Sequence, residues 1–479
     1  MNNFMLLSFS TANVLSDNVY FALCGILSIA VLVGIHLMSK VEKAQLGNKI
    51  SAIAIALAIV ITLIKNDILP LWLIYPGVII GLIIGLVIAK RVKMIQMPQL
   101  VALLNGVGGA ASAIVASFAF IKLYPAVEDP DFFGRFTSSL AIAIGSITLF
   151  GSLVAAGKLH KVLSQKPVTL PLHQVLSMGL LIILLALVVF GGFFNLTSTA
   201  VILMATILIA SAFGIVFSIR VGGADMPITI SLLNSFSGVA AAVTGFAIGD
   251  VLLVSVGGIV GASGLFLTQI MCRAMNRSLM DILLGKTSAK NTKVEKADVP
   301  EASKEDEGEQ VAIDPVEAIK NAKTAIIVPG YGMALAQAQH LVNTLAKKMK
   351  TNGTSVKYAV HPVAGRMPGH MDVLLVEAGV GFDDVYEMDD VNEEFKDVDV
   401  TIVIGANDVL NPAARHAEGT PIYGMPILNV DECKNIVIFN YDLKPGYSGV
   451  DNPIYKRKEG VVVVQGDAAK TIAELLDKI

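Results

Sequence analysis

The stretch that decides the fold is LLIILLALVVF at residues 180–190, which is apolar on every side of a helix. It lies inside a longer run, 174–194, that contains no charged residue. About 20 apolar residues span a bilayer as an α-helix, and a helix that is apolar all round suits lipid. The stretch therefore predicts a transmembrane helix.

The same pattern recurs on both sides of this stretch. The sequence predicts nine spans in a lipid bilayer, near 19–39, 50–64, 72–90, 99–123, 138–157, 174–194, 198–219, 228–248 and 251–270. The composition agrees, because 54% of the residues are hydrophobic and only 16% are charged, against about 25% charged in soluble globular chains. We expect residues 1–18 to be a short extramembrane lead, since they lack the positive region of a signal peptide.

Positive charges between the predicted spans lie on alternate sides. Fourteen Lys and Arg residues, Lys158 among them, lie in one set of loops and the tail after the ninth span, and three lie in the other set. Loops rich in Lys and Arg face the cytoplasm. The bias predicts an N-terminus outside, a C-terminal part inside and an odd number of spans.

Ionisable side chains are scarce inside the predicted spans, and no Asp or Glu lies in the middle of one. The polar candidates are Asn105, Ser152 and Asn234, with Asp225 and His36 nearer the ends. Amides in a bundle often only bridge helices, and an amide cannot carry a proton as His or Asp can. Should protons cross here, these amides order water and a titrating group comes from elsewhere.

The chain changes character after residue 284. Residues 285–321 are rich in charged residues and poor in large apolar ones, which indicates a flexible linker with a short helix near 316–321. The sequence thus predicts a membrane domain over 1–284, a linker over 285–321 and a soluble domain over 322–479.

Short β-rich runs alternate with helical patterns in the soluble part. The predicted strands are 324–328, 355–360, 384–388, 400–405, 435–439 and 461–465, and a helical pattern covers 333–350. Alternating strands and helices form βαβ units with a parallel sheet. Six strands predict a Rossmann-like α/β domain with a parallel six-stranded sheet, an architecture that binds dinucleotides.

The first predicted strand runs into the sequence Gly330-Tyr331-Gly332-Met333-Ala334. Glycine at a strand-to-helix turn permits a tight turn and lets a pyrophosphate approach the backbone. Leu335 replaces the third glycine of the dinucleotide fingerprint. The strand context favours phosphate binding over an ordinary turn.

The second predicted strand is followed by His361-Pro362-Val363-Ala364-Gly365-Arg366, which contains no carboxylate. NAD sites usually place Asp or Glu here for the ribose 2′-OH, whereas Arg suits a 2′-phosphate. The pattern favours NADP(H) over NAD(H). The alternative is a surface Arg on a loop.

Two more glycine-bearing loops follow the fourth and fifth strands. They read Gly405-Ala406-Asn407-Asp408 and Lys444-Pro445-Gly446-Tyr447-Ser448-Gly449. Asp408 is either part of a site or a turn residue, and the second loop is either a lid or a plain loop. Because the carboxyl ends of parallel strands meet at one edge, three such loops favour one shared site.

Other features exclude functions. The net charge of −3 without clustered Lys or Arg argues against a nucleic-acid partner. The three cysteines, Cys24, Cys272 and Cys433, form no C-x-x-C pair and are expected to be inert thiols. No metal site is expected.

At this point the residues match a known family, the proton-translocating NAD(P) transhydrogenases, which the chain resembles from about residue 20 to its end. The matching blocks of the C-terminal part are Gly330–Gln339, His361–Met371, Gly405–Ala414, Gly446–Pro453 and Gly466–Ala468. Those of the membrane part are Met97–Leu104, Gly151–Leu159, Gly222–Pro227, Ser231–Gly238 and Met271–Ser278.

The resemblance implies a β-type subunit that binds NADP(H) and pairs with an α-type subunit that binds NAD(H), as a dimer of αβ units in the bacterial plasma (inner) membrane. The implied reaction is hydride transfer from NADH to NADP⁺, of the Re/Si-specific type, coupled to inward proton movement. No catalytic residue is expected, because the hydride passes directly between the cofactors.

The resemblance also implies site residues. Those for the nucleotide are Gly330, Tyr331, Gly332, Met333, Ala334, Val363, Ala364, Gly365, Arg366, Met367, Pro368, Gly405, Ala406, Asn407, Asp408, Lys444, Gly446, Tyr447, Gly466, Asp467 and Ala468. Asn105, Ser152, Asp225 and Asn234 match positions implicated in the proton path or its coupling.

The chain departs from the family pattern at two places. Asn105 stands where some members carry His. Asn440-Tyr441 stands where a Lys-Arg pair typical of the family holds the 2′-phosphate, and the nearest cation is Lys444. We hypothesise either weakened NADP(H) selectivity or compensation by Arg366 and Lys444.

Two other functions fit parts of the pattern. A channel or secondary transporter gated by a nucleotide would need a selectivity loop, a mid-span charge or discontinuous helices, none of which is clear. A membrane-anchored dehydrogenase would not need nine spans.

Overall fold

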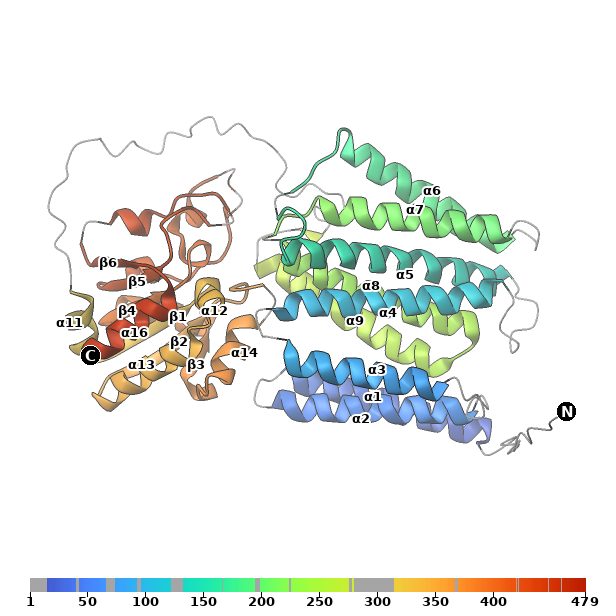
Figure 1. The fold of residues 1–479 in the computed structure, drawn as a ribbon, viewed down its shortest axis with the longest axis horizontal. Helices are drawn as coiled ribbons and strands as arrows, with labels where there is room; N and C mark the ends of the chain where they lie inside the picture. Colours follow the sequence, from blue (N-terminus) through green and yellow to red (C-terminus); the bar gives the residue numbers. More distant parts are fainter. Residues whose placement is uncertain are drawn as a thin grey trace. The chain divides into compact units, whose positions relative to one another are not determined.

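The structure, a computed structural model, describes most of the chain (Figure 1). The described residues are 15–39, 43–65, 74–92, 96–121, 132–165, 167–193, 199–223, 225–274, 278–279, 314–366, 369–418, 420, 422–446, 448–457 and 459–479. Most of the predicted linker, and the site candidates Met367, Pro368 and Tyr447, lie outside them. The described residues form a part made of long helices and a part built on a sheet.

Nine helices within the described residues are long and apolar enough to cross a membrane, which confirms the predicted number of spans. They are α1 (Asp17–Met38), α2 (Ala44–Lys65), α3 (Ile74–Arg91), α4 (Met97–Phe120), α5 (Phe132–Leu159), α6 (His173–Phe193), α7 (Thr199–Ile219), α8 (Met226–Ile248) and α9 (Val251–Ala274). Helices α2 and α5 are longer than predicted. The additional residues at the start of each helix include a charged one, Lys49 in α2 and Arg135 in α5, and so do not belong to an apolar stretch.

The helices approach one another closely where glycine faces a small residue. A Cβ added to Gly109 of α4 would lie 2.8 Å from the carbonyl oxygen of Gly145 on α5, and one added to Gly238 of α8 would lie 2.8 Å from Cα of Gly261 on α9. Small residues permit such backbone approach, which supplies packing where lipid removes the hydrophobic driving force. Helix α5 is the most buried of these helices, since 67% of an 18-residue apolar segment within it is buried.

The described residues of the C-terminal part form one sheet of six parallel strands. These are β1 (Thr324–Pro329), β2 (Ser355–Val360), β3 (Val385–Glu387), β4 (Val400–Ile404), β5 (Ile436–Asn440) and β6 (Val461–Gln465). Their order is β3-β2-β1-β4-β5-β6, with every neighbouring pair parallel. This confirms the predicted Rossmann-like fold. The order reverses between β1 and β4, and such a switch point is where open α/β sheets bind ligands.

Different elements cover the two faces of the sheet, because right-handed crossovers on either side of the switch point lie on opposite faces. Helices α13 (Gln339–Thr351), α14 (His370–Glu377) and α16 (Ala468–Lys478) pack together on one face (Figure 1). On the other face, α15 (Met388–Val391) and the 3₁₀ turns between β4 and β5 enclose a core that includes Ile326 and Phe395.

The helix predicted over 333–350 is interrupted. Helix α12 (Tyr331–Ala336) ends at Gln337, whose φ is 54°, and α13 begins two residues later. The N–H groups of Gln337 and Ala338 donate to the carbonyls of Ala334 and Met333, the pattern that closes a helix at a left-handed residue. Apolar periodicity does not register a single left-handed residue. Near the predicted helix at 316–321, α11 (Pro315–Lys320) begins at a cap, because the side chain of Asp314 accepts from the N–H of Val316.

Candidate functional site

The loops after β1 and β4 pack against each other at the switch point. The N–H of Gly332 donates to the carbonyl of Gly405 at 2.8 Å. A Cβ added to Gly332 would lie 2.6 Å from Cα of Gly405, and one added to Gly330 would lie 2.5 Å from Cα of Ala406. Gly405 itself has a φ of 66°. These glycines are required by the close approach of the two loops, and the N–H of Gly332 is engaged within the protein.

The loop after β5 is fastened to the loop after β4. The carboxylate of Asp408 accepts hydrogen bonds from the N–H of Ser448 at 3.0 Å and from its Oγ–H at 2.7 Å. The side-chain amide of Asn407 donates to the carbonyl of Lys444 at 3.0 Å, and that of Asn452 donates to Oδ1 of Asn407 at 3.1 Å. We call residues 444–452 the β5 loop. Its attachment brings Asp408 and Gly446 together, as the sequence predicts for a shared edge.

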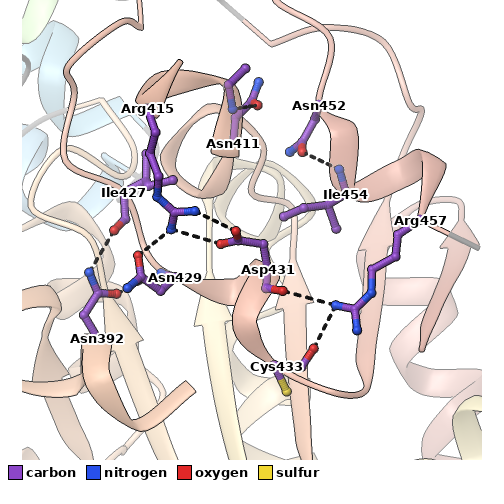
Figure 2. A network of polar contacts seen from close by, with 11 residues as sticks. Asn392, Asn411, Arg415, Ile427, Asn429, Asp431, Cys433, Asn452, Ile454 and Arg457 are labelled. Atoms are coloured by element: carbon purple, nitrogen blue, oxygen red, sulfur yellow. Dashed lines mark hydrogen bonds and ion pairs between the residues drawn. The ribbon is translucent and has the colours of Figure 1, made fainter. Parts of the chain in front are cut away.

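The segment between β4 and β5 is held by polar side chains in place of a long helix (Figure 2). Arg415 donates to both carboxylate oxygens of Asp431, at 2.6 and 3.1 Å, and to Oδ1 of Asn429 at 2.6 Å. Arg457 donates to the carbonyls of Asp431 at 3.2 Å and Cys433 at 2.9 Å. Such bidentate pairing sets geometry as well as energy. The network supports the segment that carries Asp408.

Two asparagines that sequence reasoning missed shape the same region. Asn411 accepts from the N–H of Ala413 at 3.0 Å, and Asn452 accepts from the N–H of Ile454 at 3.1 Å (Figure 2). Each asparagine precedes a proline, and Asn-Pro pairs initiate turns. That signal was present in the sequence.

The loop after β2 meets the first glycine loop through an aromatic contact. The guanidinium carbon of Arg366 lies 4.5 Å from the ring centroid of Tyr331. Arg366 is buried, unlike the surface residue of the alternative interpretation. The backbone N–H of Arg366 donates to Nδ1 of His370 at 3.1 Å, and Gly365, with a φ of 106°, packs against the His370 ring. Arg366 thus lies beside the turn that follows β1.

Two buried histidines belong to this region and are neutral at physiological pH. Nε2 of His361 lies 2.8 Å from the carbonyl of Pro426, and its Nδ1 accepts from the N–H of Val363 at 3.2 Å. Burial lowers the pKa of His361 to about 4. Burial, and then the charge of Arg366, lower the pKa of His370 to about 4.

We predict that the sheet-containing part loses stability as pH falls from about 6.5 to about 4. The folded-state pKa values are depressed, so the unfolded chain binds protons first, and the stabilisation is complete only above the unfolded pKa. For His361 the loss is roughly 3 kcal/mol. Hydrogen exchange of peptides from β1–β6 in the intact protein, corrected for intrinsic rates, measures it. His361→Gln should weaken the dependence of stability on pH, and His340→Gln, at an exposed position, should not. The same dependence of stability on pH in wild type and both variants would show that His361 is not responsible.

Neither Asn440, the last residue of β5, nor Tyr441 after it is a Lys or an Arg. The amide of Asn440 is buried and donates to the carbonyl of Ala406 at 3.1 Å and to the Tyr455 hydroxyl oxygen at 2.7 Å. Tyr441 is 80% exposed. The Asn440 side chain is thus held by these two hydrogen bonds within the protein. Lys444, on the β5 loop, is exposed. Tyr455 was not anticipated, because nothing local in the sequence links it to a residue fifteen positions away.

The stretch Gly466–Ala468 follows β6 at the same edge of the sheet. The N–H of Gly466 donates to the carbonyl of Asn440 at 3.0 Å. The carboxylate of Asp467 accepts from the N–H of Ala469 at 3.0 Å and so caps α16. The structure therefore places this stretch beside β5 and gives Asp467 a capping role.

In the helical part, Asn105 and Ser152 are buried where α4 meets α5. A Cβ added to Gly106 would lie 3.0 Å from Cβ of Ser152. Helix α4 also approaches α8, since a Cβ added to Gly108 would lie 3.1 Å from Oγ of Ser237, one turn beyond Asn234. The Oγ of Ser152 is buried and makes no hydrogen bond within the described residues. These three candidates thus lie on helices that contact one another.

Asp225, the fourth candidate, is buried at the start of α8. Its backbone carbonyl accepts from the N–H of Thr229 at 3.3 Å, in the first turn of the helix. It follows a turn in which its own N–H donates to the carbonyl of Gly222 at 3.2 Å.

The nine membrane-length helices among the described residues, and a Rossmann-like sheet with glycine loops at its switch point, define a polytopic membrane protein with an α/β domain of the dinucleotide-binding type. The chain belongs to the NAD(P) transhydrogenase beta subunit family, whose sequence model matches residues 21–478. An NAD(P) transhydrogenase subunit beta of Rhodospirillum rubrum is 39% identical over 467 residues, which cover 95% of this chain and 97% of the relative. The same protein from a named strain of that species matches to the same extent. The resemblance is confirmed, and a beta subunit implies an alpha partner.

Proposed function

We propose that this chain is the NADP(H)-binding and proton-conducting subunit of a transhydrogenase that couples hydride transfer between NADH and NADP⁺ to proton movement across the membrane. The observation that carries the proposal is the meeting of the β1, β4 and β5 loops at the switch point of a sheet, in a chain whose described part also contains nine membrane-length helices. Family membership supports the reaction.

The residues at the switch point fit a dinucleotide. Gly330, Gly332 and Gly405 let the backbones of the loops after β1 and β4 pack against each other, which gives the tight strand-to-helix turn of a dinucleotide site. The bound nicotinamide supplies or accepts the hydride, so the protein need only hold and orient it. Asp408 holds the β5 loop to this edge, and Arg366 brings positive charge beside Tyr331. The remaining residues implied by the resemblance belong to the same proposed site: Met333, Ala334, Val363, Ala364, Gly365, Met367, Pro368, Ala406, Asn407, Lys444, Gly446, Tyr447, Gly466, Asp467 and Ala468.

The membrane helices would carry the protons through water ordered by Asn105, Ser152 and Asn234. Ser152 supports this role because its buried hydroxyl has an unused hydrogen-bonding capacity within the described residues, a place that suits a bound water. Asp225 adds an ionisable group at the start of α8. Protonation in the bundle would then shift the nucleotide domain between states that bind NADP⁺ and NADPH differently.

The organisation follows from the same proposal. Residues 1–284 form the proton-translocating domain, 285–321 the linker and 322–479 the NADP(H) domain. The charge bias of the loops supports an N-terminus outside and a cytoplasmic C-terminal domain in a bacterial inner membrane. The partner alpha subunit would bind NAD(H), in a dimer of αβ units.

We predict that Lys444→Gln lowers the affinity for NADP(H) about tenfold and leaves the affinity for NAD(H) unchanged. The Asn440 amide donates to Ala406 and Tyr455, so it does not serve a 2′-phosphate. The exposed ammonium of Lys444 is the nearest positive charge after β5 that could bind this phosphate. A hydrogen bond between charged groups contributes about 1.5–3 kcal/mol. Equilibrium titration of the purified chain with each nucleotide measures both affinities.

Lys434→Gln is the matched control, since Lys434 is exposed at the opposite end of β5. If wild type binds NADP(H) and NAD(H) equally, the NADP(H) assignment fails. If it prefers NADP(H) but Lys444→Gln binds like wild type, 2′-phosphate recognition does not involve Lys444.

A further inference from the structure

A buried lysine lies at the last turn of α5. Lys158 is only 1% exposed, and its ammonium donates to the carbonyl of Val221 at 2.7 Å and to that of Ile219. Ile219 is the last residue of α7, whose final carbonyls have no donors within the helix. A cation suits the negative end of a helix dipole. Lys158 therefore caps α7 from another helix.

This burial is unusual for a lysine at a helix end. Lysines in such places usually extend their ammonium group into water, because removing an unpaired ammonium from water is costly. Within the described helical part, the buried Lys, His and Asp side chains are those of Lys158, His173 and Asp225. His173 stabilises the turn at the start of α6, since its Nδ1 accepts from the N–H of Leu170 at 3.2 Å. Lys158 links distant segments, because its ammonium donates to backbone carbonyls at the end of α7 and just beyond it.

Backbone hydrogen bonds tie the same two segments together. The N–H of Val168, in the loop after α5, donates to the carbonyl of Ile219 at 3.2 Å. The N–H of Gly223, in the turn after α7, donates to the carbonyl of Gln165 at 2.9 Å. Lys158 thus adds two side-chain bonds to a clamp between the loop after α5 and the turn at 220–225.

The turn held in this way leads directly to Asp225. The clamp reaches Val221 and Gly223, and the turn closes when the N–H of Asp225 donates to the carbonyl of Gly222 at 3.2 Å. Helix α8, which carries Asn234, begins at the next residue. A change in α5, the helix that carries Ser152, would reach this turn through the Lys158 ammonium.

We propose that Lys158 is a positioning residue of proton coupling, which fixes the turn at 220–225 and so the place of Asp225. The inference rests on the proposed function and adds a link from α5 to the turn between α7 and α8. The ammonium acts through the backbone carbonyls of Ile219 and Val221, and Lys158 is not among the residues proposed to bind the nucleotide. Its loss should therefore reduce coupling without changing nucleotide affinity.

The test compares Lys158→Met, which removes the ammonium, with Lys158→Arg, which keeps a charged donor, and with Lys161→Met as an exposed control. Each variant is placed in sealed vesicles with the alpha subunit. We expect Lys158→Met to lower protons moved per hydride at least threefold, with a KM for NADP(H) within twofold of wild type. Lys158→Arg should recover at least half of the ratio. If Lys158→Met does not accumulate, Lys158→Gln takes its place with the same expected direction.

Hydrogen exchange of peptides covering 217–231 gives a readout independent of the reaction. Lys158→Met should raise exchange there at least tenfold, and Lys158→Arg should restore protection. Unchanged exchange and an unchanged proton-to-hydride ratio in Lys158→Met would overturn the inference. An equal loss of rate and proton movement, with the ratio preserved, would also overturn it, since that is the result of a merely structural role. Absence of coupled transfer in wild type would instead defeat the proposed function, while the exchange result still decides whether Lys158 holds the turn.

Discussion

Replacement of Gly332 by Ala is expected to lower the affinity of this chain for NADP(H) at least a hundredfold. The new Cβ would lie 2.6 Å from Cα of Gly405, and Gly405 cannot yield, because its own φ is 66° and its backbone packs on the β1 loop. Overpacking against backbone costs about 1–3 kcal/mol or more, and a hundredfold change corresponds to about 2.7 kcal/mol. The loops after β1 and β4 would separate, and the switch point would lose its shape. Fluorescence titration of NADPH measures the affinity.

Gly381→Ala is the matched control, because a Cβ there would make an ordinary contact, 3.6 Å from Oδ2 of Asp384. It should bind NADP(H) as wild type does. A folded Gly332→Ala protein with an affinity within threefold of wild type would show that the nucleotide binds elsewhere.

Asp408→Asn should speed the release of NADP(H) tenfold or more. The carboxylate accepts from both the N–H and the Oγ–H of Ser448, whereas an amide has one acceptor oxygen and would turn an NH₂ group towards a donor. Loss of one charge-assisted hydrogen bond costs about 1.5–3 kcal/mol. The β5 loop would detach from the edge of the sheet more often. Stopped-flow displacement of bound NADPH measures the release rate.

Ser448→Ala removes only the hydroxyl bond and should speed release about threefold to fivefold, since a neutral donor contributes roughly 1 kcal/mol. Asp397→Asn, at an exposed residue before the amino end of β4 and so at the opposite edge of the sheet from Asp408, should have no effect. Equal release rates in wild type and Asp408→Asn would show that the β5 loop does not control the nucleotide.

The sequence predicts the elements well because their signals are local. A run such as 180–190 is too apolar for anything but lipid or a core, and the six β-rich runs appear as β1–β6 with ends that match or differ by one residue. The break at Gln337 is missed, since one left-handed residue leaves the apolar pattern intact. In any parallel sheet the carboxyl ends of the strands lie at one edge. This rule alone predicts that the glycine loops lie at the same edge.

Contacts between distant residues are what the sequence could not supply. Asp408 and Ser448 are forty positions apart, and nothing local marks them as partners. Lys158 counts in the sequence only as one positive loop charge, yet it is buried and holds the end of α7. The hydrogen bonds from Asn440 to Ala406 and Tyr455 likewise become visible only in the folded structure. Burial and partnership of polar side chains depend on the tertiary structure.

The central claim is that this chain binds NADP(H) and couples its reduction to proton movement. The most direct measurement uses sealed vesicles that contain the chain and its alpha partner, with hydride transfer from NADH to an NADP⁺ analogue followed while the internal pH is recorded. We predict transfer accompanied by proton uptake, lost when either chain is omitted and lost in Gly332→Ala. Absence of transfer, together with an ion flux that responds to NADP(H) alone, would contradict this account and indicate a nucleotide-gated transporter.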